Sequence, residues 1–432
     1  MRHGRHGNPS GFRAIGFATM TRSTLRKIKA TDLKPGMHLH ELCGSWMDHP
    51  FWRSKFTLSD PADIRRILDS GIVEVWIDTA KGADLPATSS ARPPVDSAPA
   101  MNATHAPTDS GPPHAWTTKQ VTLDEELKRA AMICARARSA VVSMFQEVRM
   151  GKAIDAEAAG ELVEEISSSV LRNPGALISL ARLKTADDYT YMHSVAVCAL
   201  MVALARQLDL DEQGTREAGM SGLLHDIGKA MMPMDILNKP GKLTDDEFRV
   251  IQSHPVEGHR LLMEGKSASE IVLDVCLHHH EKMDGSGYPD RLPGGRISVF
   301  AKMGAVCDVY DAITSNRPYK AGWDPAESIR RMAEWSKGHF DEVVFQAFVK
   351  SIGIYPTGSL VLLASGRLAV VVEQSEKSLL APRVKAFFST KAQAYVVPET
   401  IDLSHPAATD RIVGREDASK WGIRNLDDLW AG

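Results

Sequence analysis

The chain has 432 residues, of which 43% are hydrophobic and 24% are charged, a composition typical of soluble globular proteins. A chain of this length exceeds what one compact core organises, so we expect two or three domains. The formal net charge of −3 excludes an overall basic character of the kind that binding to duplex nucleic acid usually requires. We therefore expect no nucleic-acid polymer as a partner.

Cysteine content and hydropathy bear on the cellular compartment. The five cysteines are odd in number and include no Cys-x-x-Cys pair, which argues against a disulfide framework and favours the reducing cytoplasm. The longest apolar run, 195–205, is shorter than the ~20 residues that cross a bilayer, so it predicts a buried helix and no membrane partner. The N-terminus contains arginines but no apolar segment typical of a secretion signal.

The first part of the chain predicts a small module followed by a linker. Residues 1–19 have no hydrophobic period and are interpreted as disordered or untranslated, because Met20 opens a more ordinary start. Residues 20–80 alternate between strand patterns and one helix pattern, which predicts a small α+β module. Residues 81–115 consist largely of Ala, Pro, Ser, Thr, Gly and Asp, so a flexible linker is expected there.

The rest of the chain changes from helical to β patterning. Residues 116–352 carry apolar side chains at helical spacing with short interruptions. Residues 353–432 are β-rich, with a predicted strand on each side of Ser365-Gly366 and another in the segment AYVVPETIDL. The predicted fold class is therefore mainly α: an all-helical core, preceded by the α+β module and followed by a short β-rich extension.

Histidines and carboxylates gather in the helical part. Seven of the 16 histidines fall between residues 185 and 330, and several lie beside a carboxylate. The pair His225-Asp226 follows apolar residues, and a buried aspartate needs a partner. The pair is either a hydrogen bond within a helical core or part of a site for iron, manganese or zinc, which imidazole and carboxylate suit.

Further candidate ligands lie on other predicted helices. His193 lies on an apolar face, and Asp308 follows small residues that let a neighbouring helix approach closely. Together the candidate ligands suffice for two metal ions, and two ions are the usual arrangement for phosphate-ester hydrolysis. The candidate ligands are His193, His225, Asp226, His254, His279, His280 and Asp308. Lys229 is either placed to hold a phosphate oxygen or assist the leaving group, or is a solvated helix-end charge.

The order and spacing of five motifs resemble the HD-GYP family, the branch of the HD phosphohydrolase superfamily that hydrolyses c-di-GMP. The motifs are HDIGK (225–229), NKPGKLTDDE (238–247), HPVEGHRLL (254–262), HHEKMDGSGYP (279–289) and RPYK (317–320). The resemblance extends over residues 185–348 and implies an all-helical HD-type catalytic domain. The module before it resembles a subgroup in which an uncharacterised N-terminal domain precedes HD-GYP.

The resemblance assigns roles to individual residues. It implies that the seven candidate ligands hold iron or manganese, with Asp226 as the bridge, and that His278 is an extra histidine. Lys229 matches the catalytic-site lysine and Asp187 an acid near it. The substrate-binding residues that it implies are Arg317 and Lys320, which grip phosphates, and the pocket-shaping loop residues Gly287, Tyr288 and Pro289. In this family the GYP loop is also a candidate contact for GGDEF-domain proteins.

One departure from the family pattern bears on metal number. Many members carry a glutamate four residues before the first histidine ligand, where it helps to hold a third metal. This chain has Tyr189 at that position, and a neutral phenol is a poor substitute for a carboxylate ligand. We therefore expect two divalent ions per chain.

The expected reaction is metal-dependent hydrolysis of c-di-GMP by a metal-bridging hydroxide, giving linear pGpG and, as an open point, GMP. The resulting function is to lower second-messenger levels. Two alternatives remain: an HD-type phosphohydrolase acting on another nucleotide, and a catalytically silent c-di-GMP sensor. The sequence does not determine the oligomeric state, and a homodimer is one of the states it allows.

Overall fold

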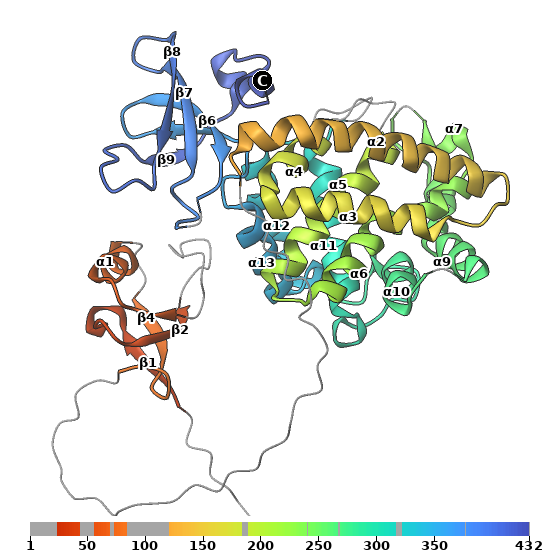
Figure 1. Ribbon diagram of the computed structural model, residues 1–432, viewed down its shortest axis with the longest axis horizontal. Helices are drawn as coiled ribbons and strands as arrows, with labels where there is room; N and C mark the ends of the chain where they lie inside the picture. Colours follow the sequence, from red (N-terminus) through yellow and green to blue (C-terminus); the bar gives the residue numbers. More distant parts are fainter. Residues whose placement is uncertain are drawn as a thin grey trace, which may run out of the picture. The chain divides into compact units, whose positions relative to one another are not determined.

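The computed structural model has two compact units: residues 1–49 with 53–96, and residues 50–52 with 97–432 (Figure 1). The residues that the structure describes are 24–43, 56–69, 73–83, 121–183, 189–239, 241–266, 268–316, 322–375 and 377–431. Segment 1–19 lies outside them, and of the expected linker only 81–83 is described.

The first unit is an antiparallel sheet with one α-helix. Its elements are β1 (Leu25–Lys29), a 3-10 turn (Ala30–Asp32), β2 (His38–Cys43), β3 (Phe56–Thr57), α1 (Pro61–Asp69) and β4 (Glu74–Asp78). The strand order is β1-β4-β2-β3. Val75 and Ile77 of β4 are fully buried, as the period of two along a strand requires. Helix α1 follows Asp60, whose carboxylate accepts the Ala62 amide over 2.8 Å.

The second unit begins with a helical domain. Its α-helices are α2 (Leu123–Arg149), α3 (Ala156–Arg172), α4 (Pro174–Arg182), α5 (Tyr189–Gln207), α6 (Glu212–Leu224), α7 (Met234–Leu237), α8 (Asp245–Ile251), α9 (His254–Gly265), α10 (Glu270–His278), α11 (Val299–Thr314), α12 (Pro325–His339) and α13 (Glu342–Ile352). Short 3-10 helices lie between some of them, notably η3 (Ile227–Met231) and η4 (Gly294–Arg296).

Helix α5 forms the centre of this domain. It contacts α2, α3, α4, α6, α11 and α13, and every residue from Val195 to Ala205 is at most 7% exposed. A helix that is apolar on all sides is stable in water only when others surround it. The buried helix predicted for this segment is confirmed. Within the described residues, no helix is both long and apolar enough to span a membrane.

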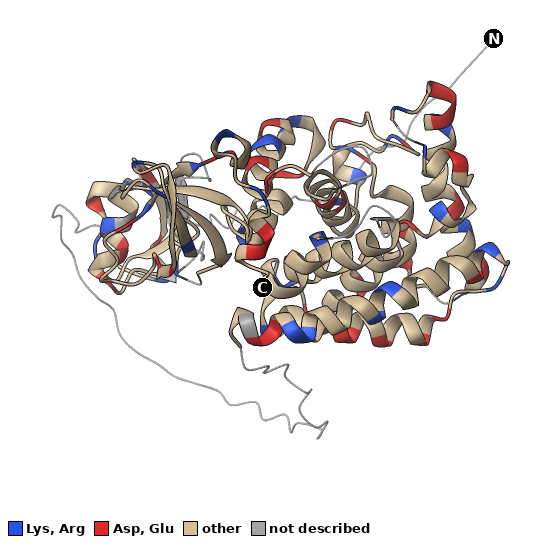
Figure 2. Ribbon diagram, turned by 90° about the horizontal axis from the view of Figure 1, so that it is seen from above, with Lys and Arg blue, Asp and Glu red and all other residues tan. Residues whose placement is uncertain are grey.

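Helices α2 and α3 lie antiparallel on one side of the domain (Figure 1). Two ion pairs join them in antiparallel register: Arg172 Nε to Glu126 Oε2 at 2.7 Å, and Arg136 Nη1 to Glu165 Oε1 at 3.0 Å. Figure 2 shows acidic and basic residues interspersed along the helices that face the viewer. In that view the charges do not gather into one basic stretch of the kind that nucleic-acid binding needs.

A five-stranded antiparallel sheet follows the helices. Its strands are β5 (Leu360–Leu363), β6 (Arg367–Glu373), β7 (Arg383–Ser389), β8 (Ala394–Asp402) and β9 (Ile412–Arg415), in the order β8-β7-β6-β5-β9. Alternate residues of β6 enter two cores, Leu368 and Val370 on one face with Trp430, and Ala369 and Val371 on the other. The mainly-α fold class with a β-rich C-terminal segment is confirmed, whereas β7 and β9 were not foreseen.

Candidate metal centre

Five segments of the helical domain converge on one buried cluster of histidines and aspartates. The seven predicted ligands fall into two groups whose ligand atoms lie within 4.8 Å of one another: Asp226, His254, His279 and His280; and His193, His225 and Asp308. Except for the half-buried His280, all are at most 7% exposed. They come from α5, the end of α6, the start of α9, the end of α10 and the middle of α11.

A close packing of backbones brings Asp226 to His254. Helix α6 ends at Leu224, and the chain continues through His225-Asp226 into the 3-10 helix η3. A Cβ atom on Gly228 in η3 would lie 1.9 Å from the carbonyl oxygen of His254, so only glycine allows this approach. Lys229 lies on this tighter 3-10 turn, three residues from Asp226.

Backbone carbonyls orient three of the histidine rings. Nδ1 of His225 lies 2.8 Å from Gly222 O, and Nδ1 of His254 lies 2.7 Å from Ile251 O. Nδ1 of His279 lies 3.1 Å from the carbonyl oxygens of its own helix α10. A carbonyl only accepts, so each Nδ1 carries the hydrogen and each Nε2 presents its lone pair to the cluster.

The two oxygens of Asp226 face different histidines. Oδ2 lies 3.3 Å from Nε2 of both His193 and His225, whereas Oδ1 lies 3.1 Å from Nε2 of His254 and 3.8 Å from Nε2 of His279. Asp308 also reaches both groups, since Oδ1 is 3.0 Å from His193 Nε2 and Oδ2 is 3.6 Å from His280 Nδ1. Both carboxylates thus face both groups, and Asp226 has contacts of 3.3 Å or less with each of them.

The residues present fit a divalent transition metal. Nε2 of His225 lies 3.3 Å from Nε2 of His193, and Nε2 of His254 lies 3.3 Å from Nε2 of His279. Two lone pairs this close repel each other unless a proton or a metal cation lies between them. Oδ1 of Asp226 is buried without a hydrogen-bond donor among the described residues, which is costly unless a cation satisfies it. Imidazole and carboxylate together suit iron, manganese or zinc.

The aspartates are held in their charged form. Burial alone would raise the pKa of Asp226, but the positive charge of Lys229 and the neighbouring imidazoles of His225 and His193 hold it well below its usual range. Burial likewise opposes ionisation of Asp308, but the hydrogen bond from His193 and nearby histidine charges keep its pKa low. Both side chains are therefore ready to bind a cation without losing a proton.

The histidines divide into two electrostatic classes. Burial and the neighbouring histidines lower the pKa of His279, and burial foremost lowers the pKa of His280 to about 3. Burial also disfavours the charged form of His193, but Asp226, Asp308 and Asp311 override it and raise its pKa to about 10. Without a metal, a proton on His193 balances the aspartates, and a cation binding there displaces it.

Comparison with known proteins finds two family models that match the chain one after the other. Residues 25–159 match a domain of unknown function, DUF3391, and residues 170–344 match the HD domain. A cyclic di-GMP phosphodiesterase of Pseudomonas aeruginosa is 56% identical over 409 residues, which is 94% of this chain and 96% of that protein. The chain belongs to the HD-GYP family.

More distant relatives match a smaller share of the chain. A cyclic di-GMP phosphodiesterase response regulator of Xanthomonas campestris is 41% identical over 34% of this chain and 40% of its own length. A 3'3'-cGAMP-specific phosphodiesterase of Vibrio cholerae is 36% identical over 38% of each chain.

The GYP loop that gives HD-GYP proteins their name lies against the cluster. The ring of Tyr288 stacks on His280 with centroids 4.7 Å apart, and the Tyr288–Pro289 peptide bond is cis. A Cβ atom on Gly287 would lie 2.5 Å from the α-carbon of Glu281. The loop residues predicted to bind substrate are thus next to the cluster, with Tyr288 in direct contact with it.

The structure brings some of the predicted HD-GYP site residues together and leaves others undescribed. Lys229 Nζ lies 2.5 Å from Asp226 Oδ2, so it is adjacent to the seven candidate ligands. Asp187, Arg317 and Lys320 lie outside the described residues, as does the side chain of Tyr189. The extra histidine, His278, points away from the cluster to Asp274, whose Oδ1 is 2.7 Å from its Nδ1.

Sequence reasoning missed two buried carboxylates of this HD-GYP domain. Asp311 Oδ2 lies 2.6 Å from Nδ1 of His193, and Glu281 accepts the backbone amides of Asp290 and Leu292 at 2.7 and 3.1 Å. The spacing of Asp311 three residues after Asp308 on one helix could have revealed the first. Nothing in the sequence near Glu281 indicates that it fastens the GYP loop.

Proposed function

We propose that this chain is a metal-dependent phosphodiesterase that hydrolyses c-di-GMP to linear pGpG, with a further step to GMP left open. The observation that carries the proposal is the buried Asp226 carboxylate, whose two oxygens each face one of two histidine groups. The substrate follows from the cyclic di-GMP phosphodiesterase that is 56% identical over nearly the whole chain.

The proposed ligand sets are His193, His225 and Asp308 for one ion and His254, His279 and His280 for the other, with Asp226 shared. Two ions, iron or manganese, are proposed, and when bound they supply positive charge to the phosphate and acidify water for attack on phosphorus. Each set leaves coordination positions for water and substrate.

The chain's own residues have three further tasks in this proposal. Lys229 holds a proton beside Asp226 and can donate it to a phosphate or leaving-group oxygen. Tyr288, stacked on His280, forms one side of the substrate position. Arg317 and Lys320 bind the phosphates, and Asp187 assists near Lys229.

A second candidate substrate is 3'3'-cGAMP. It is favoured by one observation, the 36% identity over 166 residues to a 3'3'-cGAMP-specific phosphodiesterase. The two substrates differ in one base, so the metal-binding cluster serves both equally. A competition assay with equal concentrations of c-di-GMP and 3'3'-cGAMP separates them by the ratio of their kcat/KM values.

The proposal also includes partners and setting. We place the protein in the cytoplasm, where the substrate is made and used as a messenger. The proposed protein partners are GGDEF-domain proteins, which would contact the GYP loop. A homodimer is also part of the proposal.

For domain boundaries we propose a module at 20–80, a linker at 81–115, a helical region at 116–352 with its catalytic core at 185–348, and a β-rich extension at 353–432.

The deciding experiment is hydrolysis by the purified full-length chain. Protein stripped of metal and reloaded with Mn²⁺ is incubated with c-di-GMP, and the products are separated by chromatography. We expect pGpG, with or without a further step to GMP, and no turnover after metal removal. Asp226→Ala removes the shared ligand and should lower kcat by at least about 10³-fold.

Asp246→Ala is the matched control, because the side chain of Asp246 on α8 is 85% exposed and lies on the helix surface. It should retain wild-type turnover. Full activity of a folded Asp226→Ala protein, or the absence of any c-di-GMP hydrolysis by the metal-loaded wild type, would overturn the proposal.

A further inference from the structure

The buried histidines of the cluster are oriented in two chemically different ways. Nδ1 of His225, His254 and His279 each lies within 3.1 Å of a neutral backbone carbonyl oxygen. Nδ1 of His193 instead lies 2.6 Å from the carboxylate oxygen Oδ2 of Asp311. One of the two proposed cation positions therefore has a carboxylate behind its histidine.

Asp311 is held behind the His193 ring, on the side away from the cluster. It lies on α11 one turn after Asp308, and it is 2% exposed. Its other oxygen, Oδ1, accepts a hydrogen bond from the Ser315 hydroxyl at 3.3 Å. Because Oδ2 lies on the Nδ1 side of the imidazole ring, it points away from the Nε2 atom that faces the cluster.

A carboxylate behind a histidine ligand has a known physical effect. It fixes the tautomer, with the hydrogen on Nδ1, and it fixes the ring orientation. It also increases the electron density on Nε2, which strengthens that atom as a donor to a cation. A carbonyl oxygen fixes the tautomer as well, but it carries no negative charge.

We propose that Asp311 is a positioning residue for His193 and makes the position formed by His193, His225 and Asp308 the tighter of the two for a divalent cation. This inference rests on the proposed metal centre, but not on the identity of the substrate.

The surrounding charges support this asymmetry. Besides the shared Asp226, the first position has two carboxylates, Asp308 as a ligand and Asp311 behind His193. The ammonium of Lys229 lies 2.5 Å from Oδ2 of Asp226, on the same side, and opposes cation binding there. Asp308 also approaches the second position, since its Oδ2 lies 3.6 Å from Nδ1 of His280. The carboxylate that favours the first position alone is therefore Asp311 behind His193, whereas the backbone carbonyls behind His254 and His279 carry no charge.

The test measures metal affinity rather than activity. Metal-free full-length protein is titrated with Mn²⁺ by calorimetry, and we expect a tighter and a weaker class of site. Asp311→Asn keeps an acceptor for Nδ1 but removes the charge, and it should weaken the tighter class by about 10–100-fold. The weaker class should be unchanged.

Two further variants, each of which retains one of the two metal positions, show which position Asp311→Asn weakens. In His254→Ala protein, which retains the first position, Asp311→Asn should weaken the remaining ion by a similar factor. In His225→Ala protein, which retains the second position, it should have no effect. Equal weakening in both backgrounds, or none in either, overturns the proposal.

A matched control separates a positioning role from a merely structural one. Asp274→Asn alters a similar aspartate–histidine pair, at 2.7 Å to His278, outside the cluster. It should leave both affinity classes unchanged. If Asp311 only stabilised the fold, the Asp311→Asn protein would have a lower melting temperature but wild-type Mn²⁺ affinities. That result would also contradict the proposal.

A measurement on the wild type covers the case in which Asp311→Asn does not fold. Crystals of wild-type protein soaked with one equivalent of Mn²⁺ should show anomalous density first beside His193. Density appearing first between His254 and His279 overturns the inference while leaving c-di-GMP hydrolysis intact. Failure of Mn²⁺ to bind at all would instead remove the metal centre and, in the product assay, the proposed function with it.

Discussion

Lys229 Nζ lies 2.5 Å from Oδ2 of Asp226, the oxygen that also faces His193 and His225. Only 20% of the Lys229 side chain is exposed, so the ammonium is held at the edge of the cluster. It can neutralise charge on a bound phosphate or donate a proton to the departing oxygen. It supplies no lone pair for a metal while it is protonated.

Lys229→Met should therefore separate turnover from metal binding. We expect kcat for c-di-GMP to fall by about 10²–10⁴-fold, with Mn²⁺ binding retained or tightened because a competing cation is gone. Product formation and calorimetric titration measure the two effects. Lys128→Met, on the exposed face of α2, serves as the control. Unchanged kcat in Lys229→Met would remove this lysine from the mechanism.

Gly287→Ala should displace the GYP loop. The added Cβ would lie 2.5 Å from both Glu281 Cα and Lys282 N, and backbone atoms cannot move aside as a side-chain end can. Because Tyr288 would then shift off His280, we expect a lower kcat/KM and a stability loss of about 1–3 kcal/mol. Gly295→Ala is the control, since nothing lies within 4 Å of its Cβ position. Equal behaviour of the two variants would contradict the close packing.

The sequence predicts much of this site because its chemistry is local. Histidine and aspartate in apolar helical surroundings, as at His193 and Asp226, indicate buried ligands whatever the exact packing. The helical core and the small residues before Asp308 were likewise predicted. One of these small residues is Gly304, where a Cβ atom would lie 3.3 Å from the Cβ of His279, so the absence of a side chain lets the two helices approach closely. The structure brings the seven candidate ligands together in two groups.

What the sequence could not predict depends on tertiary contacts. The 3-10 turn at Lys229 follows from the approach of Gly228 to the His254 carbonyl, which no local pattern encodes. The fastening of the GYP loop by Glu281 likewise depends on where the loop returns. Strand β7 pairs with β6 and β8 in a hydrogen-bonded ladder, and its mixed sequence RVKAFFS was not recognised without them.

The pair Arg317 and Lys320 should act in substrate binding. These residues follow α11 in the RPYK motif, where a cationic pair can grip one phosphate. Replacing both with alanine should raise KM for c-di-GMP more than it lowers kcat, because ground state and transition state carry the same phosphate. Steady-state kinetics check this, and an unchanged KM would show that the residues bind something else.

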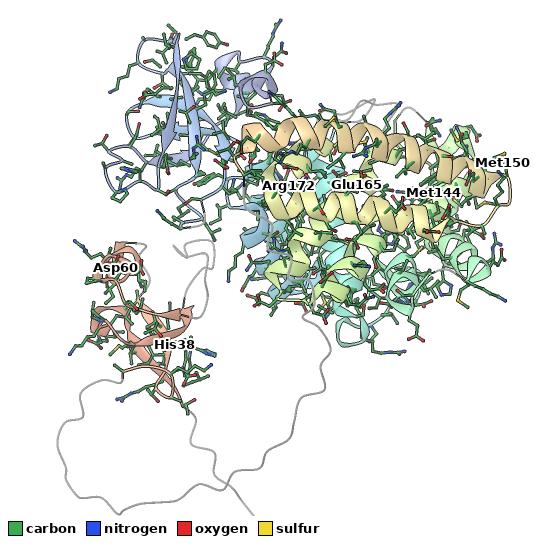
Figure 3. The ribbon with its side chains drawn as sticks, in the orientation of Figure 1. His38, Asp60, Met144, Met150, Glu165 and Arg172 are labelled. Atoms are coloured by element: carbon green, nitrogen blue, oxygen red, sulfur yellow. The ribbon has the colours of Figure 1, made fainter. Side chains whose placement is uncertain are left out.

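Breaking the buried ion pair between α2 and α3 should destabilise the helical domain. Glu126 is fully buried, and its carboxylate accepts from Arg172 at 2.7 and 2.8 Å and from Ser169 at 2.8 Å. Figure 3 labels Arg172 on α3. Arg172→Ala leaves that charge without its main partner, so the free energy of unfolding should fall by about 3–5 kcal/mol. Urea unfolding followed by circular dichroism measures it.

Arg136→Ala is the matched control for this pair. It breaks the Arg136–Glu165 ion pair between the same two helices, whose side chains are 64% and 38% exposed. An exposed pair contributes at most about 1 kcal/mol, so the loss should be much smaller. Adding Glu126→Gln to Arg172→Ala should restore part of the stability, because the uncompensated charge is then absent. Equal losses for the two arginine variants would contradict the burial argument.

Glu327 on α12 connects the helical domain to the C-terminal sheet. Its carboxylate lies 2.7 Å from Arg330 Nη2, 2.8 Å from Arg331 Nε and 2.7 Å from Arg415 Nη2 in β9. The hydrogen bond from Arg330 contributes most, and together with the other two arginines it lowers the pKa of Glu327 from 4.5 to about 2 against the opposing effect of burial. Folding thus favours the ionised form.

The stability contributed by Glu327 should therefore disappear in acid. A depressed folded-state pKa stabilises the protein fully above the unfolded-state pKa of 4.5, and the contribution is lost as the pH falls toward about 2. Metal-free Glu327→Gln should have a lower melting temperature than the wild type at pH 6, and the difference should vanish near pH 2. Using metal-free protein removes the effect of acid on the histidine ligands. Glu334→Gln, at a position that is 54% exposed, should show almost no difference at either pH. A wild-type advantage over Glu327→Gln that stays constant from pH 6 to pH 2 would show that the arginines do not stabilise the ionised carboxylate.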